Sequence, residues 1–238
     1  MTSDPTQHLS SGSGRTAFVR TRWWWVRHAP VRSDDGRIYG QSDIACDCGD
    51  THIFERLAAE LPKDAVWVTS HLRRTHQTAL ALWQAGYLAE GTAPPEPIVV
   101  PDFAEQNLGA WQGQDRAGFF ADRQPMAASY WFAPAEERPP EGESFADLCR
   151  RVAAAIERLT AEHAGRDIVA VAHGGTIRGA IAHALDLAPQ AALAFAVENC
   201  SLTRLDHYSG ETGSGWRIGV VNRHGWPEGG PARHAPQG

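Results

Sequence analysis

Histidine and arginine side chains stand in this sequence directly after short apolar runs. In chain order these groups are Arg27-His28, then Ser70 with Arg73 and Arg74, then His173-Gly174-Gly175. Arginine suits phosphate because its planar guanidinium donates two parallel hydrogen bonds. A helix that opens on glycines offers unpaired backbone N–H groups, which also bind anions. If the three groups meet, their residue types predict a pocket for a phosphate group.

The apolar runs before these groups are predicted to be buried strands. Periodicity and composition predict strands over residues 22–27, 65–69, 98–100, 168–172, 201–207 and 216–222, and helices over 50–61, 72–85, 144–163 and 176–187. Ser70 is the expected N-cap of the second helix, and Ser144 with Asp147 resembles a capping box. This alternation predicts an α/β three-layer sandwich, with a mostly parallel central sheet and helices on both faces. Ligands of such sheets bind where the strands end, and the three groups stand there.

The organisation predicted along the chain is one domain between two tails. Residues 1–20 are rich in Ser, Gly and Thr and are expected to form a flexible tail, and residues 225–238 a loose one. The domain spans residues 21–224. It contains an irregular insertion over about residues 105–140, and a segment of that length without regular structure usually carries function.

Composition narrows the class of protein. The 238 residues are 42% hydrophobic and 21% charged, which suits one globular α/β domain. The net charge of −6 argues against a nucleic-acid partner, because proteins that bind nucleic acid are basic. No apolar run reaches the ~20 residues that span a bilayer, and residues 1–20 lack the apolar core of a signal peptide. We therefore expect a cytoplasmic protein with no membrane contact.

The four cysteines are expected to be free thiols. Cys46, Cys48, Cys149 and Cys200 are too sparse for the disulfide framework of a secreted protein. One residue separates Cys46 from Cys48, whereas two residues separate the cysteines of zinc and redox motifs. No metal site is therefore predicted here.

Five segments in chain order resemble the signature motifs of one protein family. They are Arg27-His28-Ala29, Ser70 to Ala79, Glu105 to Gly113, Pro140 to Ser144, and Ala172 to Gly175. Together they resemble the histidine phosphatase superfamily, with its phosphoglycerate-mutase-like fold, over about residues 23–222. The loop from Tyr39 to Asp43 and the Gly-Glu-Ser segment look most similar to α-ribazole phosphatases, which act in the cobalamin pathway, and to broad-specificity phosphatases.

The resemblance implies catalytic roles for His28, Glu105 and His173. His28 would attack the phosphorus atom and become a phosphohistidine, which requires a neutral imidazole with one nitrogen free. Glu105 would protonate the leaving alkoxide and then serve as base for the water that attacks the phosphohistidine. Fixed positive charges would do the work that a metal ion does in other phosphatases, so the resemblance implies no metal and no other cofactor.

The resemblance also implies which residues hold the substrate phosphate. They are Arg27, Arg74, His173 and Gly174. The motif selects Arg74 over its neighbour Arg73, which offers the same chemistry in another register. Positioned donors of this kind can each be worth ~3 kcal/mol of the activation barrier.

Two departures from the family pattern concern the first motif. Ala29 replaces the usual glycine, which adds one methyl group and narrows the backbone conformations available. The segment from Pro30 to Asp34 lacks the family's phosphate-binding asparagine, so that role is not transferred. The expected substrate pocket includes Arg32, Gln41 and Trp111.

The activity implied is hydrolysis of a small phosphorylated metabolite, and α-ribazole 5′-phosphate is one substrate to test. A phosphoglycerate mutase is an alternative, but it needs basic residues for the substrate carboxylate, and residues 105–143 offer only Arg116, Arg123 and Arg138. A non-catalytic phosphate-binding or regulatory module is another, and the retention of both histidines with Glu105 argues against it. The sequence leaves open whether the protein is a monomer or a homodimer.

Overall fold

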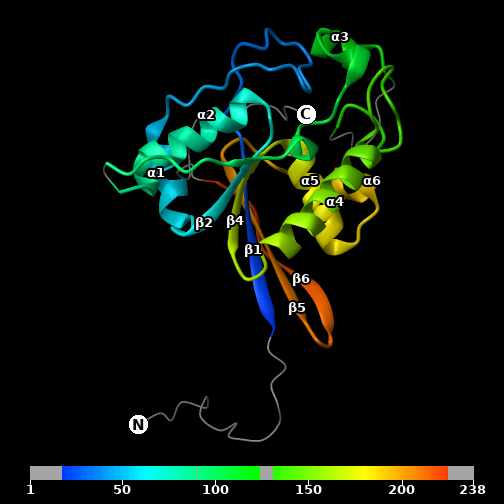
Figure 1. Cartoon of the computed structure of the whole chain (residues 1–238). Helices are drawn as coiled ribbons and strands as arrows, with labels where there is room; N and C mark the ends of the chain where they lie inside the picture. Colours follow the sequence, from blue (N-terminus) through cyan, green and yellow to red (C-terminus); the bar gives the residue numbers. More distant parts are fainter. Residues whose placement is uncertain (1–17, 90, 124–130, 225–238) are drawn as a thin grey trace, which may run out of the picture.

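The structure is a computed structural model that describes residues 18–89, 91–123 and 131–224 (Figure 1). The predicted tails, residues 1–20 and 225–238, lie outside the described residues except for residues 18–20, where the first strand already begins. Within the described part of the chain, no helix has both the length and the apolar character to cross a membrane.

The sheet has six strands in the order β3-β2-β4-β1-β5-β6. The strands are β1 (Val19–Arg27), β2 (Ala65–Thr69), β3 (Ile98–Val99), β4 (Asp167–Ala172), β5 (Ser201–Gly210) and β6 (Gly213–His224). β3, β2, β4 and β1 pair in parallel, β5 is antiparallel to β1, and β6 is antiparallel to β5. All strands except β5 therefore run in one direction, and this mixed sheet confirms the predicted α/β architecture.

Helices cover both faces of the sheet (Figure 1). One face carries α1 (Thr51–Glu60) and α2 (Arg73–Leu82), which continues as a π-turn over Trp83–Tyr87; the other carries α4 (Phe145–Glu162), α5 (Gly174–Leu185) and the short α6 (Pro189–Ala192). Successive strand residues point to opposite faces. In β1, Trp25 therefore packs in the core under α4 and α5, and Val26 in the core under α1 and α2. Because both faces are covered, the central strands read as continuous apolar runs.

The start of α2 differs from the prediction. Ser70 was the expected N-cap, but α2 begins at Arg73 and Leu72 occupies the N-cap position. The Ser70 hydroxyl instead accepts the Leu72 N–H and lies 2.8 Å from Nε2 of His173. The expected N-cap role is therefore wrong, because a long-range partner that sequence spacing cannot reveal engages this side chain.

The start of α4 has the capping box that the sequence predicts. Ser144 Oγ accepts the Asp147 N–H, and the Asp147 carboxylate accepts the Ser144 N–H. Just before this helix, the chain packs backbone to backbone against the loop after Glu105. A Cβ atom on Gly109, whose φ is +47°, would lie 2.0 Å from the carbonyl oxygen of Pro140. Glycine is therefore required at this contact.

The predicted irregular insertion, about residues 105–140, is partly regular. Pro101–Phe103, just before it, and Gly109–Trp111 form 3₁₀ turns, and Arg116–Ala121 forms the short helix α3. The Asp115 carboxylate caps α3 by accepting the Gly118 N–H. Periodicity does not reveal this helix because α3 has no buried residues.

Candidate active site

The ends of three neighbouring parallel strands bring the predicted residues together. His28 follows β1, Ser70 follows β2 and His173 follows β4. In the sheet, β4 lies between β1 and β2. The ring centroids of His28 and His173 are 5.2 Å apart, and both side chains are fully buried. Arg74, in the first turn of α2, places its Nε 3.3 Å from Nδ1 of His173. The structure therefore places His28, Arg74 and His173 in one site.

His28 presents a free ring nitrogen. Its Nδ1 lies 2.7 Å from the carbonyl oxygen of Ala29, and because a carbonyl only accepts, Nδ1 carries the proton. Nε2 is buried and has no hydrogen-bond partner among the described residues. Burial, followed by the charges of Arg74 and Arg27, holds the pKa of His28 well below its usual value. The imidazole is therefore neutral at neutral pH, the form a nucleophile needs.

Ala29 fits its position despite replacing the family's glycine. The described non-glycine residues with positive φ do not include Ala29, so its methyl group causes no backbone strain of that kind. Its N–H donates to Oγ1 of Thr78 at 2.9 Å, and its carbonyl holds the ring of His28. Ala29 thus fixes the orientation of the histidine before it.

Arg74 is anchored by the loop that precedes α1. Its Nη2 donates to the carbonyl of Gly40 at 2.7 Å and its Nη1 to that of Ser42 at 2.8 Å. A guanidinium has five N–H donors, so the two Nη atoms each keep one for another acceptor. Arg73 is exposed, whereas Arg74 is fully buried. The structure therefore places Arg74, as the motif indicated, and not Arg73 in the site.

His173 bridges the two sides of the site. Its Nδ1 accepts from Arg74 Nε, so Nε2 carries the proton and donates to Ser70 Oγ. Burial, and then the charge of Arg74, holds the pKa of His173 well below its usual value. Two neutral imidazoles therefore lie side by side among cationic groups.

Two further guanidinium groups flank the first residue of α5. Arg27 donates from Nη1 to the carbonyl of Val197 at 2.6 Å, and its buried Nε has no partner in the described structure. Arg178 stacks over the ring of Trp131 at 4.8 Å, and its buried Nη1 likewise lacks a partner among the described atoms. A Cβ atom on Gly174 would lie 3.2 Å from Arg178 Nη1 and 3.4 Å from Arg27 Cζ. Both arginines therefore face the predicted phosphate-binding glycine.

Arg178 was not predicted from the sequence as a site residue, although the sequence contains a signal that indicates it. Between Gly174 and Leu185 it is the only side chain of the Arg, Lys, Asp or Glu type. A lone charge in an otherwise apolar helix indicates a buried polar role. Burial, together with the charge of Arg27, lowers the pKa of Arg178 to about 10.

Glu105 completes the site beside the start of α5. Its carboxylate accepts the Gly175 N–H at 3.1 Å and the Gln106 N–H at 2.9 Å, and the residue is 8% exposed. A Cβ atom on Gly175 would lie 2.3 Å from Oε1 of Glu105. The second glycine after His173 therefore makes room for this carboxylate.

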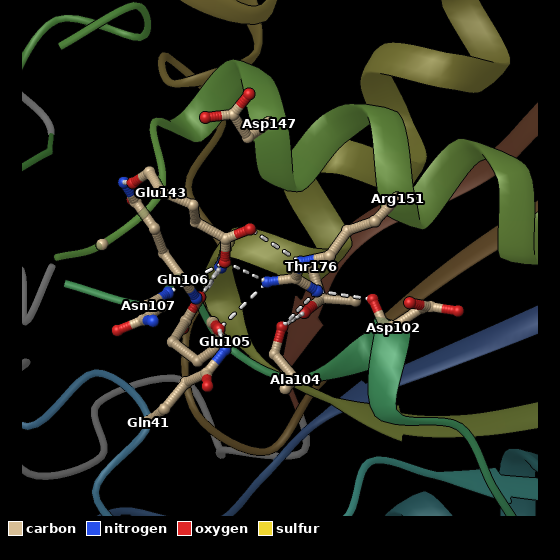
Figure 2. A network of polar contacts seen from close by, with 12 residues as sticks. Gln41, Asp102, Ala104, Glu105, Gln106, Asn107, Glu143, Asp147, Arg151 and Thr176 are labelled. Atoms are coloured by element: carbon tan, nitrogen blue, oxygen red, sulfur yellow. Dashed lines mark hydrogen bonds and ion pairs between the residues drawn. The ribbon is translucent and has the colours of Figure 1, made fainter. Parts of the chain in front are cut away.

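A polar network holds the backbone on which Glu105 stands (Figure 2). Gln41 Nε2 donates to the Glu105 carbonyl at 2.8 Å, and Arg151 Nη2 donates to the same oxygen at 3.1 Å. Arg151 also forms a two-pronged pair with the Glu143 carboxylate, at 2.6 and 3.0 Å. Glu143 in turn accepts the Asn107 N–H at 2.9 Å. Arg151 was not singled out from the sequence, because its partners lie up to 49 residues away.

The remaining predicted pocket residues have different surroundings. Gln41 is in the network around Glu105, as described above. The Arg32 side chain is 70% exposed and pairs with Asp47. Trp111 packs in the core beneath the guanidinium of Arg123, at 4.5 Å. A small hollow beside Glu105 is lined instead by Tyr39, Gly40, Leu108, Arg116 and Phe132.

The charges of the site indicate what it can bind. Three buried guanidinium groups, those of Arg27, Arg74 and Arg178, share it with one buried carboxylate, that of Glu105. Uncompensated buried charge is costly, so the excess of positive charge favours a bound dianion. The fold and the site together define an α/β protein that offers a phosphate group a cationic pocket beside a free imidazole nitrogen.

The chain belongs to the histidine phosphatase superfamily, branch 1, whose family model matches residues 23–222. This finding confirms the family resemblance and covers every site residue described above. Both phosphatases and mutase-like proteins occur among its relatives.

Individual relatives cover different shares of the chain. The metal-independent phosphoserine phosphatase of Arabidopsis thaliana is 35% identical over 163 residues, which are 64% of this chain and 64% of the plant protein. The Yersinia enterocolitica protein named "Probable phosphoglycerate mutase GpmB" is 28% identical over 197 residues, 81% of this chain and 88% of that protein. This chain therefore spans less than two thirds of the length of the plant relative.

Solved structures share the fold. A mycobacterial glucosyl-3-phosphoglycerate phosphatase is 27% identical with a TM-score of 0.69, covering 85% of this chain and 99% of that one. An Escherichia coli structure described as that of "a putative alpha-ribazole-5'-P phosphatase" has a TM-score of 0.63, covering 87% of this chain and 99% of that one. Because its identity is 19%, this second match bears on the fold alone.

The depressed pKa of buried His28 predicts a pH-dependent stability. Below its usual pKa of 6.5 the unfolded chain protonates this histidine while the folded protein does not. The free energy of unfolding should therefore fall as the pH drops from 6.5, by about 1.4 kcal/mol per pH unit for each such histidine. His28→Gln should make this fall shallower by about that amount, measured by urea unfolding between about pH 7 and pH 5.

The exposed His71 provides the control for this experiment. His71→Gln should keep the wild-type slope, because its ring is in water whether the chain is folded or not. Equal slopes in wild type and His28→Gln would show that the folded protein accommodates a protonated His28.

Proposed function

We propose that this protein is a metal-independent phosphomonoesterase that carries the phosphoryl group on His28. The observation that supports it most is the buried Nε2 of His28, without a partner in the described structure and set among guanidinium groups. A buried nitrogen without a hydrogen-bond partner costs stability, so its presence in a folded protein favours a functional reason for it. If the neighbouring guanidinium groups hold a phosphate ester, His28 Nε2 can form a bond to its phosphorus atom.

The proposed reaction has two steps. In the first, His28 Nε2 attacks the phosphorus, the ester P–O bond breaks, and Glu105 gives a proton to the leaving alkoxide. Arg27, Arg74 and Arg178 neutralise the charge on the phosphoryl oxygens during this transfer. In the second step, water attacks the phosphohistidine, Glu105 takes the water proton, and the P–N bond breaks to release inorganic phosphate and free His28.

Hydrolysis can be distinguished from mutase and binding functions in one set of assays. We expect turnover of p-nitrophenyl phosphate to persist in excess EDTA, because fixed guanidinium charges supply the neutralisation. A mutase would convert 3-phosphoglycerate when primed with the bisphosphate, and a binding module would turn over neither compound. Loss of activity in EDTA that added divalent metal restores would contradict the metal-independent mechanism.

The substrate is proposed to be a small phosphate monoester. The hollow beside Glu105 is small and is lined by the rings of Tyr39 and Phe132, with Arg116 already paired to Asp34. The names of the relatives suggest a panel of O-phosphoserine, glucosyl-3-phosphoglycerate and 3-phosphoglycerate, and the sequence adds α-ribazole 5′-phosphate. A ranking of kcat/KM over this panel identifies the class of substrate. Equal kcat/KM values for all four compounds would indicate that the pocket recognises the phosphate group alone.

Arg151 is expected to matter because it positions Glu105. Arg151→Met removes one of the two side-chain donors to the Glu105 carbonyl and leaves the Glu143 carboxylate without its ion-pair partner. We expect kcat for an alkyl phosphate to fall about 10- to 100-fold, because small misplacements of a catalytic group are costly. KM should change little, and an aryl phosphate, which needs less protonation of its leaving group, should lose less.

The adjacent Arg150 is a matched control. Its side chain is 72% exposed and pairs with Asp147 on the surface of α4. Arg150→Met should therefore leave the kinetics as in wild type. If Arg151→Met slowed alkyl and aryl phosphates equally, the network would not act through the proton donor.

A further inference from the structure

Two thiols lie together behind the phosphate pocket. All four cysteines are free, as predicted, and Cys46 Sγ is 3.6 Å from Cys48 Sγ. Both residues are partly exposed. The other two, Cys149 and Cys200, are buried. One pair of cysteines thus has its sulfur atoms close together in residues that are partly exposed.

The Cys46 sulfur has contacts of two kinds: its S–H can donate to the carbonyl oxygen of Arg74 at 3.3 Å, which favours the thiol, and the Cys48 S–H can donate to it, which favours the thiolate. The Cys48 S–H can donate to the Cys46 sulfur, and this contact, helped by Thr78 and the charge of Arg74, lowers the pKa of Cys46 to about 7. The same contact, with burial, raises the pKa of Cys48. Burial raises the pKa of Cys149 to about 12. When Cys48 donates to it, Cys46 is therefore more readily deprotonated than Cys149, and the thiolate is the reactive form of cysteine.

Cys46 also touches the elements that hold the site. Its Sγ lies 3.3 Å from the carbonyl oxygen of Arg74 and 3.6 Å from Thr78 Oγ1, and its N–H donates to Gln77 Oε1 at 3.0 Å. Thr78 Oγ1 accepts the Ala29 N–H, one residue after His28. The segment just before Cys46 supplies the carbonyls that anchor the Arg74 guanidinium. A bond that draws this sulfur toward Cys48 would therefore disturb contacts on both sides of the site.

We propose that Cys46 and Cys48 form a peroxide-reactive dithiol whose oxidation to a disulfide lowers the activity at His28. The Cys46 thiolate attacks one oxygen of a hydroperoxide: the S–O bond forms, the O–O bond breaks, and the other oxygen leaves as water or an alcohol after taking up a proton. Cys48 sulfur then attacks the sulfur of the Cys46 sulfenic acid: the S–S bond forms, the S–O bond breaks, and the hydroxyl group leaves as water after taking the Cys48 thiol proton. Two sulfur atoms are oxidised and one peroxide is reduced.

The test measures thiols and activity separately. The full chain is treated with hydrogen peroxide at a small molar excess, quenched, alkylated and analysed by peptide mass spectrometry. We expect the peptide that contains Cys46 and Cys48 to lose two hydrogen atoms while Cys149 stays reduced. Turnover of p-nitrophenyl phosphate should fall about tenfold and return with dithiothreitol, a size typical of coupling between two sites.

Two variants sharpen the result. In Cys48→Ser no disulfide can form, so a sulfenic acid on Cys46 should be trapped by dimedone; Cys149→Ser should behave as wild type throughout. A peroxide-treated protein in which Cys46 and Cys48 stay reduced, or react no faster than Cys149, would overturn the proposal. A disulfide that forms without a change in turnover would overturn its link to the site. The mass measurement does not depend on the proposed phosphatase activity.

Discussion

Replacing His28 by alanine is expected to reduce hydrolysis of p-nitrophenyl phosphate by about 10⁴-fold or more, the scale seen when a catalytic nucleophile is removed. The reason is that alanine offers no nitrogen to form the P–N bond, while the guanidinium groups can still bind phosphate. The measurement is steady-state kinetics on a variant whose folding is verified by circular dichroism and thermal unfolding. A cavity at this buried site should cost some stability without removing the fold.

The exposed His71 again gives a matched control, and His71→Ala should keep wild-type kinetics. A folded His28→Ala protein with more than a few per cent of the wild-type rate would mean that another group attacks phosphorus. His173 would be the next residue to test, because its ring lies 5.2 Å from that of His28.

Glu105→Gln is expected to separate substrates by their leaving groups. Glutamine keeps an oxygen that can accept the Gly175 N–H but has no acidic proton to give. For an alkyl phosphate we expect kcat/KM, which reports the first step, to fall about 10²- to 10⁴-fold, the usual contribution of a positioned acid. For p-nitrophenyl phosphate the fall in the first step should be much smaller, because the phenolate leaves without full protonation.

The comparison is the ratio of the two losses in kcat/KM, which reports the first step and not the second step that both esters share, measured on the same preparation. A larger loss for the alkyl ester supports Glu105 as the proton donor. Equal losses for both esters would show that Glu105 is not the proton donor. Its carboxylate would then only accept the Gly175 N–H at the start of α5. The network through Arg151 would then be structural.

The sequence predicted those features that local pattern controls. The strands before His28 and His173 are apolar runs, and their parallel pairing follows from strand–helix alternation. The capping box at Ser144 is likewise local. Because parallel strands end at one edge, the meeting of His28, Arg74 and His173 could be predicted from these elements.

Features that depend on long-range packing could not be predicted. Ser70 looked like a helix cap, but its hydroxyl engages His173, 103 residues away. Arg178 lies in an otherwise apolar helix, and its position beside Gly174 could not be predicted from that apolar pattern. Arg32 pairs with Asp47 and its side chain is largely exposed, an arrangement that the spacing of the two residues does not reveal. The spacing of residues along the chain does not determine which side chains meet in the folded protein.

The central claim is a covalent bond between phosphorus and Nε2 of His28. It is tested most directly by mixing the enzyme with a phosphate ester, quenching in alkali within the first turnover, and locating the phosphoryl group by peptide mass spectrometry. We predict one phosphorylated peptide that contains His28, stable in alkali and hydrolysed by acid, and absent in His28→Ala. A phosphoryl group on another residue, or none in an enzyme that is turning over, would contradict it.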